Sequence, residues 1–174
     1  KSKFNKFFLI FYYLSIFKHF VGIRKVKLKY LKKFKKNKKY EKLIISWGFK
    51  NNFNSEGNFK DKYLKKETKN TNDTLWLIIY MDDVLPKKID SNILLLYKDQ
   101  SIFGQFIFFF NYIFNTFKNS NFTDYLKNLN SFAAFFSEIK KIIISQINEK
   151  DISKILIIYE GQPYQKEIIK FFKK

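Results

Sequence analysis

The chain has 174 residues, enough for one domain with a hydrophobic core, and it contains no cysteine. It therefore has no disulfide, zinc–thiolate site or thiol nucleophile, and a catalytic triad or histidine-rich metal site would have to use its single histidine, His19. The excess of 34 Lys and Arg over 15 Asp and Glu gives a net charge of +19, which usually indicates a nucleic-acid or anionic-membrane partner. Phe, Tyr, Ile, Asn and Lys are all encoded by AT-rich codons, so we attribute part of this charge to nucleotide bias.

The first 40 residues combine an apolar stretch with a basic run. Residues 7–17 are almost continuously apolar, but a membrane span needs about 20 such residues. Lys and Arg are dense between Arg24 and Lys39. Two interpretations stay open: an interfacial anchor on an anionic cytoplasmic leaflet, or a core-packing helix with a solvated basic tail. We expect His19 to be an interfacial side chain of this helix. We define residues 1–40 as a basic amphipathic helical segment and 41–174 as a separate domain.

Four short apolar runs beyond residue 40 predict buried strands. They lie at 42–47, 75–81, 92–97 and 154–159. The second run is apolar on both faces, as expected in the middle of a parallel sheet. The polar stretch 51–72 between the first two runs predicts a long loop.

Longer apolar segments separate the last two runs and follow the fourth. Residues 102–118 predict a very aromatic, buried helix, residues 122–147 one helix or two, and residues 162–173 a final helix with Pro163 in its first turn. This order predicts an α/β fold with an open, mostly parallel, Rossmann-like sheet and helices on both faces. Because the chain begins at Lys1 and ends within a predicted helix, we expect a fragment of a longer protein.

Ligands of open α/β sheets bind beyond the carboxyl ends of the strands. The sharpest candidate there is the turn Tyr159-Glu160-Gly161-Gln162-Pro163, which leaves the fourth strand and starts a helix. Glu160 could act as a general base toward a hydroxyl, Gly161 permits a close backbone approach, and Gln162 starts a helix with free N–H groups. The alternative is that Glu160 caps the helix and Gly161 serves only the turn.

Two further strand exits are weaker candidates. Trp47-Gly48 follows the first strand, and Asp82-Asp83 follows the second and could in principle hold a metal. An acidic pair more often solvates a loop, so we expect no metal and no cofactor. The five glycines stand alone, without a phosphate-binding loop, so a nucleotide site is expected outside this chain.

The stretch Lys154-Ile-Leu-Ile-Ile-Tyr-Glu-Gly-Gln-Pro-Tyr-Gln165 resembles a turn of bacterial surface-polysaccharide and lipopolysaccharide glycosyltransferases. Two other stretches are similar in kind. One is Ile45-Ser46-Trp47-Gly48, with Gly57, Phe59, Asp61 and Tyr63 downstream; the other runs from Thr74 to Tyr80, with Pro86 and Asn92 downstream. The likeness covers roughly residues 42–174.

The resemblance implies a GT-B-type enzyme, of which this chain is the N-terminal, acceptor-side domain. It implies a nucleotide-sugar donor, a surface glycan or lipid-linked acceptor, and no bound metal. Glu160 is then the base or acceptor-binding group, with Trp47, Gly48, Gly161 and Gln162 near the acceptor. The protein would lie in the cytoplasm, at the inner face of the membrane.

The alternative is a basic, ribosome-associated nucleic-acid-binding protein, supported by the charge and by aromatic residues within the lysine run. A third possibility is a structural, membrane-associated protein.

Overall fold

The computed structural model describes residues 17–18, 21–22, 27–32, 39–71, 73–119, 131–158 and 163–172. These residues belong to two compact units. One unit comprises residues 99–138 together with those up to 27, and the other comprises 28–98 together with 139–174. The second unit holds the β-sheet and the predicted strand exits.

The sheet has five strands in the order β1-β4-β3-β2-β5. Their bounds are Leu28–Lys32 (β1), Lys42–Gly48 (β2), Thr74–Tyr80 (β3), Ile93–Lys98 (β4) and Lys154–Ile157 (β5). β2 pairs in parallel with both β3 and β5, and β3 pairs in parallel with β4. The four apolar runs therefore form one parallel set, which confirms the predicted α/β sheet.

β1 corrects the prediction of a helical segment over residues 1–40. It is a strand that pairs antiparallel with β4, and its Leu28 is buried, as is Tyr40. Residues 1–40 therefore contribute at least these two side chains to the core. Edge strands often carry lysines that face solvent, so the basic composition of β1 conceals a strand. Residues 7–16, His19 and 33–38 lie outside the described residues.

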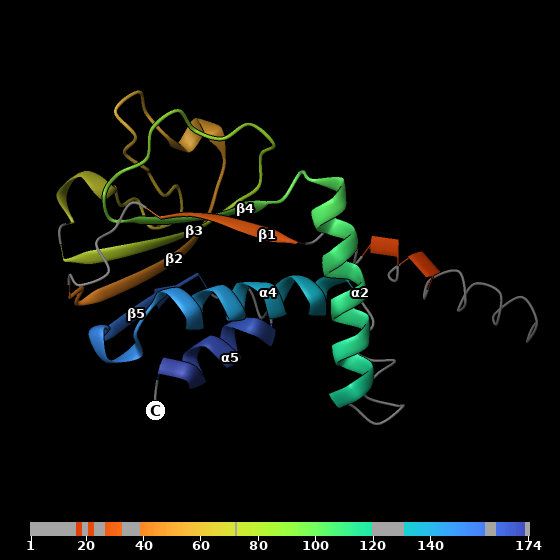
Figure 1. Ribbon diagram of the computed structural model, residues 1–174. Helices are drawn as coiled ribbons and strands as arrows, with labels where there is room; N and C mark the ends of the chain where they lie inside the picture. The colour runs from red at the N-terminus through yellow and green to blue at the C-terminus, as the bar shows by residue number, and fades with distance from the viewer. Residues whose placement is uncertain are drawn as a thin grey trace, which may run out of the picture. The chain divides into compact units, whose positions relative to one another are not determined.

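The two faces of the sheet are covered differently (Figure 1). All seven residues of β3 are buried. On one face Trp76, Ile78 and Tyr80 pack with Phe59, which comes from residues 49–71, hereafter the covering segment. The opposite face meets the end of α4 (Ser131–Gln146) and α5 (Pro163–Phe172).

We expected helices on both faces, but in the described part of the second unit the covering segment replaces them on one face. It contains only the short 3-10 helices η1 (Lys50–Asn52) and η2 (Thr68–Asn70). Its aromatic side chains supply the apolar cover that a helix would otherwise give. Phe59 is fully buried and lies 5.7 Å from Trp76 between ring centroids.

The other unit is built around α2 (Ile102–Asn119), which confirms the predicted aromatic helix. The expectation that this helix is buried is wrong for one of its faces, where Phe103, Phe110 and Phe114 are exposed. One face of α2 packs on Ala134 of α4 through Phe108, Phe109, Tyr112 and Ile113. A short cap starts the helix. The backbone N–H of Ser101 donates to Asp99 Oδ1 at 3.0 Å, and that of Gly104 donates to Ser101 Oγ at 3.2 Å. No helix among the described residues is long and apolar enough to cross a membrane.

Candidate functional site

The candidate site lies at the carboxyl edge of the parallel strands, where β2 and β3 end side by side. Two backbone donors join these exits. The N–H of Met81 donates to the carbonyl of Gly48 at 3.0 Å, and the N–H of Lys50 donates to Asp82 Oδ2 at 2.6 Å. The chain leaving β2 is thereby fixed to the chain leaving β3.

Asp82 has a structural role in this arrangement. Its carboxylate accepts the first N–H of η1, a group that has no partner within the helix itself. Asp83 is exposed. Within the described ranges, no group of three or more acidic or histidine side chains is placed to hold a metal ion. The cap on η1 therefore explains the presence of Asp82 at the β3 exit.

Trp47 and Gly48 leave β2 on opposite faces of the sheet, because successive residues of a strand alternate in direction. Gly48 faces Phe59 and the covering segment, whereas Trp47 is partly buried on the α4–α5 face. In register, Trp47 pairs with Ile79 and Gly48 with Tyr80. The structure thus places both residues at the predicted edge, but their side-chain directions do not converge.

Gly48 is required by packing. A Cβ added to it would lie 2.5 Å from Ile78 Cγ2 and 3.1 Å from Phe59 Cε2. Those distances leave no room for a methyl group between β2 and the covering segment. This close approach explains the glycine without any ligand, and its role near the acceptor stays a prediction.

Glu160, Gly161 and Gln162 lie outside the described residues, but the elements on either side of them are described. β5 runs beside β2, with Ile157 opposite Ile45. α5 starts at Pro163, as predicted for a proline in the first turn. The buried side chain of Gln165 donates through Nε2 to the carbonyl of Ile158 at 2.5 Å. This bond fixes the start of α5 to the end of β5.

A buried polar pair anchors the covering segment beneath the same edge. Ser46 Oγ donates to Asp61 Oδ2, and Asp61 Oδ1 accepts the N–H groups of Tyr63 and Leu64, each at 2.7 Å. Ser46 and Asp61 are both almost fully buried. Such a carboxylate stabilises a turn because it satisfies several donors at once. These bonds make the pair an anchor of the covering segment.

Further polar side chains continue this anchoring along the covering segment. Thr68 Oγ1 accepts the N–H of Phe59 at 2.9 Å and donates to Asp90 Oδ2 at 2.6 Å. Asn92 Nδ2 donates to the carbonyls of Thr71 and Thr74, at 3.1 and 3.0 Å. Residues quoted for the resemblance, Phe59, Asp61 and Asn92, therefore all hold the covering segment on the sheet. In the sequence, only the resemblance had singled out these three residues.

Tyr80 is the last residue of β3 and carries a titratable phenol. Burial, and secondly the negative charge of Asp82, raise the pKa of its phenol above the ordinary value. The phenol stays protonated and donates to the carbonyl of Val84 at 2.5 Å. It closes the loop after β3 and offers no base.

Comparison of the chain with models of known protein families, with curated proteins and with solved structures found no match.

Proposed function

We propose that this chain is the acceptor-side domain of a GT-B-type glycosyltransferase that transfers a sugar from a nucleotide-sugar donor to a surface glycan or lipid-linked acceptor. The observation that carries the proposal is the parallel pairing of β5 with β2. The strand that leads into Glu160 is the neighbour of the strand that leads into Trp47. In such sheets, ligands bind at the edge where parallel strands end.

In this reaction Glu160 takes the proton of an acceptor hydroxyl while that oxygen attacks the anomeric carbon of the donor sugar. A carbon–oxygen bond forms to the acceptor, the bond to the nucleotide phosphate breaks, and the nucleotide leaves with the electron pair. Trp47 and Gln162 hold the acceptor, and Gly161 lets the backbone come close to it. The donor's nucleotide is bound by a second domain outside this chain.

Residues 1–40 would bring the enzyme to its acceptor. Their basic run is attracted to the anionic inner leaflet, and the apolar stretch 7–17 is short enough to lie in the interface. A cytoplasmic enzyme held there peripherally would meet lipid-linked acceptors at the membrane surface.

Sugar transfer by the complete protein tests the proposal. Radiolabelled UDP-glucose, UDP-galactose and UDP-N-acetylglucosamine are each incubated with the protein and with membranes from the source cells as acceptor. Labelled glycan that disappears with Glu160→Gln supports the transferase. If none of the donors labels a glycan above the level of membranes alone, the proposal loses its support for these donor sugars.

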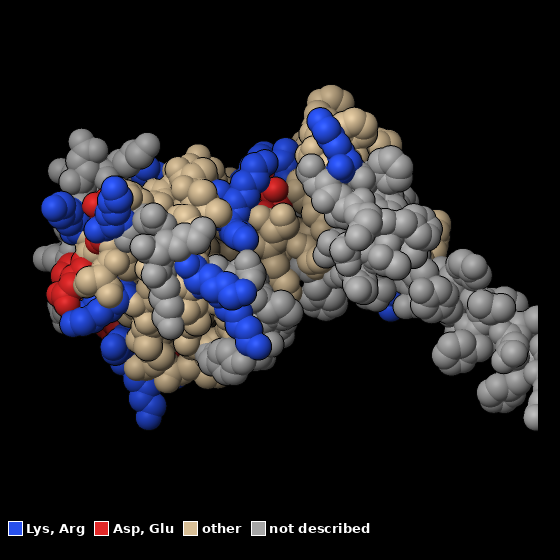
Figure 2. Space-filling view, turned by 90° about the horizontal axis from the view of Figure 1, so that it is seen from below, with Lys and Arg blue, Asp and Glu red and all other residues tan. Residues whose placement is uncertain are grey.

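The nucleic-acid-binding alternative depends on the net charge and on the lysine run, of which residues 33–38 lie outside the described residues. On the face shown in Figure 2, the lysines and arginines of the described residues are scattered and separated by uncharged surface. A phosphate backbone is usually met by a continuous basic stripe. Titration with a 30-nucleotide RNA over a range of salt concentrations tests it directly, because tight binding with a steep salt dependence would favour this alternative.

A further inference from the structure

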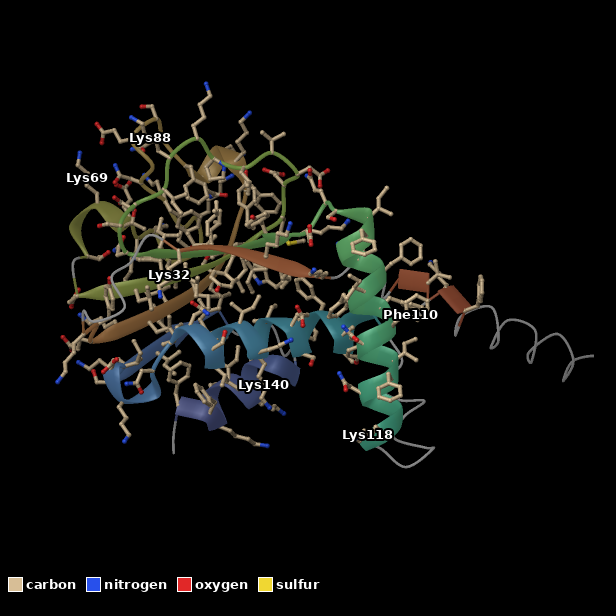
Figure 3. The ribbon with its side chains drawn as sticks, viewed as in Figure 1. Lys32, Lys69, Lys88, Phe110, Lys118 and Lys140 are labelled. Atoms are coloured by element: carbon tan, nitrogen blue, oxygen red, sulfur yellow. The ribbon has the colours of Figure 1, made fainter. Side chains whose placement is uncertain are left out.

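Helix α2 carries an exposed apolar stripe. We define the α2 stripe by five side chains: Phe103, Phe106, Ile107, Phe110 and Phe114. They are 45% to 76% exposed. Their spacing of three, four and seven residues places them on one side of a helix with 3.6 residues per turn. Figure 3 labels Phe110 of this stripe, and Lys118 in the last turn of the same helix.

The rest of α2 is already used for packing or capping. Phe108, Phe109, Tyr112 and Ile113 pack with Ala134. By helical spacing, Phe108 and Tyr112 lie on the side of the helix away from the stripe, and Ile113 borders it. Gln105 Oε1 accepts the N–H of Lys27 at 3.1 Å. The stripe is therefore a second apolar face, and the described core of this unit does not use it. An exposed patch of five large apolar side chains on one helix indicates a partner.

The chemistry around the stripe selects the partner. α2 contains no acidic residue, its one charged side chain is Lys118, and the chain as a whole carries +19. A second copy carries the same net charge of +19, which opposes the approach of two chains, and a nucleic acid offers phosphates rather than an apolar surface. An anionic bilayer fits both the net positive charge and the apolar stripe, because its headgroups attract the cationic chain and its acyl boundary accepts Phe and Ile.

The flanks of the stripe fit the same partner. Asn111 and Asn115 are exposed and uncharged, so they can lie at headgroup level beside Phe110 and Phe114. The helix has 18 residues, and none of the described helices is apolar and long enough to span. Such a helix lies in the plane of the interface with its apolar face inserted.

We propose that the α2 stripe is a membrane-binding surface that inserts into the headgroup–acyl boundary of anionic bilayers. This surface is distinct from residues 1–40 and does not depend on the transferase reaction. Binding through α2 would hold the unit that contains this helix at the membrane even when the positive charge between Arg24 and Lys39 is neutralised.

Vesicle co-sedimentation of the whole chain tests the stripe. The vesicles contain phosphatidylglycerol and phosphatidylcholine in equal parts, with pure phosphatidylcholine as the uncharged arm. The double variant Phe110→Gln/Phe114→Gln should bind the anionic vesicles at least tenfold more weakly, since each exposed ring contributes to insertion. The matched control Tyr63→Gln/Val84→Gln removes two exposed apolar side chains outside α2 and should bind within twofold of the wild type. Equal binding by wild type and stripe variant overturns the proposal, as does no binding by the wild type.

A second measurement reports insertion rather than affinity. Because the chain has no cysteine, Phe110→Cys and Tyr63→Cys each give a single site for an environment-sensitive dye. On anionic vesicles the dye at position 110 should shift to shorter wavelength, and the dye at position 63 should not. A dye at 110 that is already shifted without vesicles shows that another part of the chain or a second copy covers the stripe, and this overturns the proposal. Equal shifts at both positions overturn it as well.

Discussion

The hydroxyl of Ser46 in β2 donates a hydrogen bond to the buried carboxylate of Asp61, which holds the covering segment against the sheet. The same carboxylate accepts two backbone N–H groups, so it has three donors. Replacing Asp61 with Ala leaves the two backbone N–H groups without their acceptor, and Ser46 Oγ keeps only the carbonyl of Trp47, at 3.2 Å. We expect Asp61→Ala to lower the free energy of unfolding by about 2–4 kcal/mol. Urea unfolding measures this, with Lys62→Ala as the exposed neighbouring control. A loss below about 0.5 kcal/mol would contradict the anchoring role.

Gly48 allows Phe59 to lie against the sheet, and the second prediction concerns that contact. A Cβ at position 48 overlaps Ile78 Cγ2 at 2.5 Å. Gly48→Ala should therefore destabilise the fold by about 1–3 kcal/mol through overpacking. Ile78→Ala makes room for the added methyl group, so the two changes together should cost less than the sum of the single changes. Strictly additive unfolding free energies would show that Gly48 is not constrained by this contact.

Two ion pairs at the amino edge of the sheet give a pH prediction. Lys154 Nζ lies 2.9 Å from Glu41 Oε1, and Lys42 Nζ lies 2.9 Å from Asp73 Oδ2. Hydrogen bonding to Lys154 lowers the pKa of Glu41, and hydrogen bonding to Lys42 lowers that of Asp73. A carboxylate with a lowered folded-state pKa stabilises above its unfolded pKa of about 4, and this contribution is lost as the pH falls through the folded value.

The double variant Glu41→Gln/Asp73→Asn should therefore melt slightly below the wild type at pH 7. Because both pairs are exposed, the difference should be small and should shrink in 1 M salt. It should vanish in strong acid, below the lowered pKa values. A melting difference that persists there would show that the substitutions act through packing rather than charge.

How well the sequence predicts the fold depends on where each element gets its stability. Continuous apolar runs predicted β2, β3 and β4 because those strands are buried between two layers. The fourth run was also expected to be buried, but β5 is partly exposed, with Leu156 37% exposed. β1 was missed because an edge strand with Lys29 and Lys32 resembles the surrounding basic run. The covering segment was predicted only as a loop, since its order comes from polar side chains such as Asp61 and Asn92. The bond from Ser46 to Asp61 spans 15 residues, and those from Asn92 to Thr71 and Thr74 span 21 and 18, so local patterns do not report them.

The candidate site was predictable in position but not in detail. Parallel strands bring the exits of β2, β3 and β5 to one edge, as the rule for open sheets predicts. That Asp82 caps η1 depends on Lys50, which lies 32 residues away in sequence. Likewise, the packing role of Gly48 depends on Phe59 and Ile78. The roles of Trp47, Gly161 and Gln162 toward an acceptor stay predictions.

The last prediction concerns Glu160 and separates catalysis from helix capping. Glu160→Gln keeps the size of the side chain but removes the base. General-base catalysis contributes roughly 10²–10⁴-fold, so sugar transfer by the complete protein should fall by about that factor while the melting temperature stays nearly unchanged. If Glu160 only caps α5, the change should cost about 1 kcal/mol of stability or less and leave turnover intact.

Gln165→Leu provides the structural comparison for this test. It removes the 2.5 Å bond from Gln165 Nε2 to the carbonyl of Ile158, which fixes the start of α5 to the end of β5. Its cost should appear mainly in the melting temperature, because a partly buried carbonyl loses its donor. The base hypothesis requires the opposite pattern at Glu160, a large loss of turnover with little loss of stability. A stable and fully active Glu160→Gln protein would exclude Glu160 as the base, because a glutamine side chain cannot take up the proton.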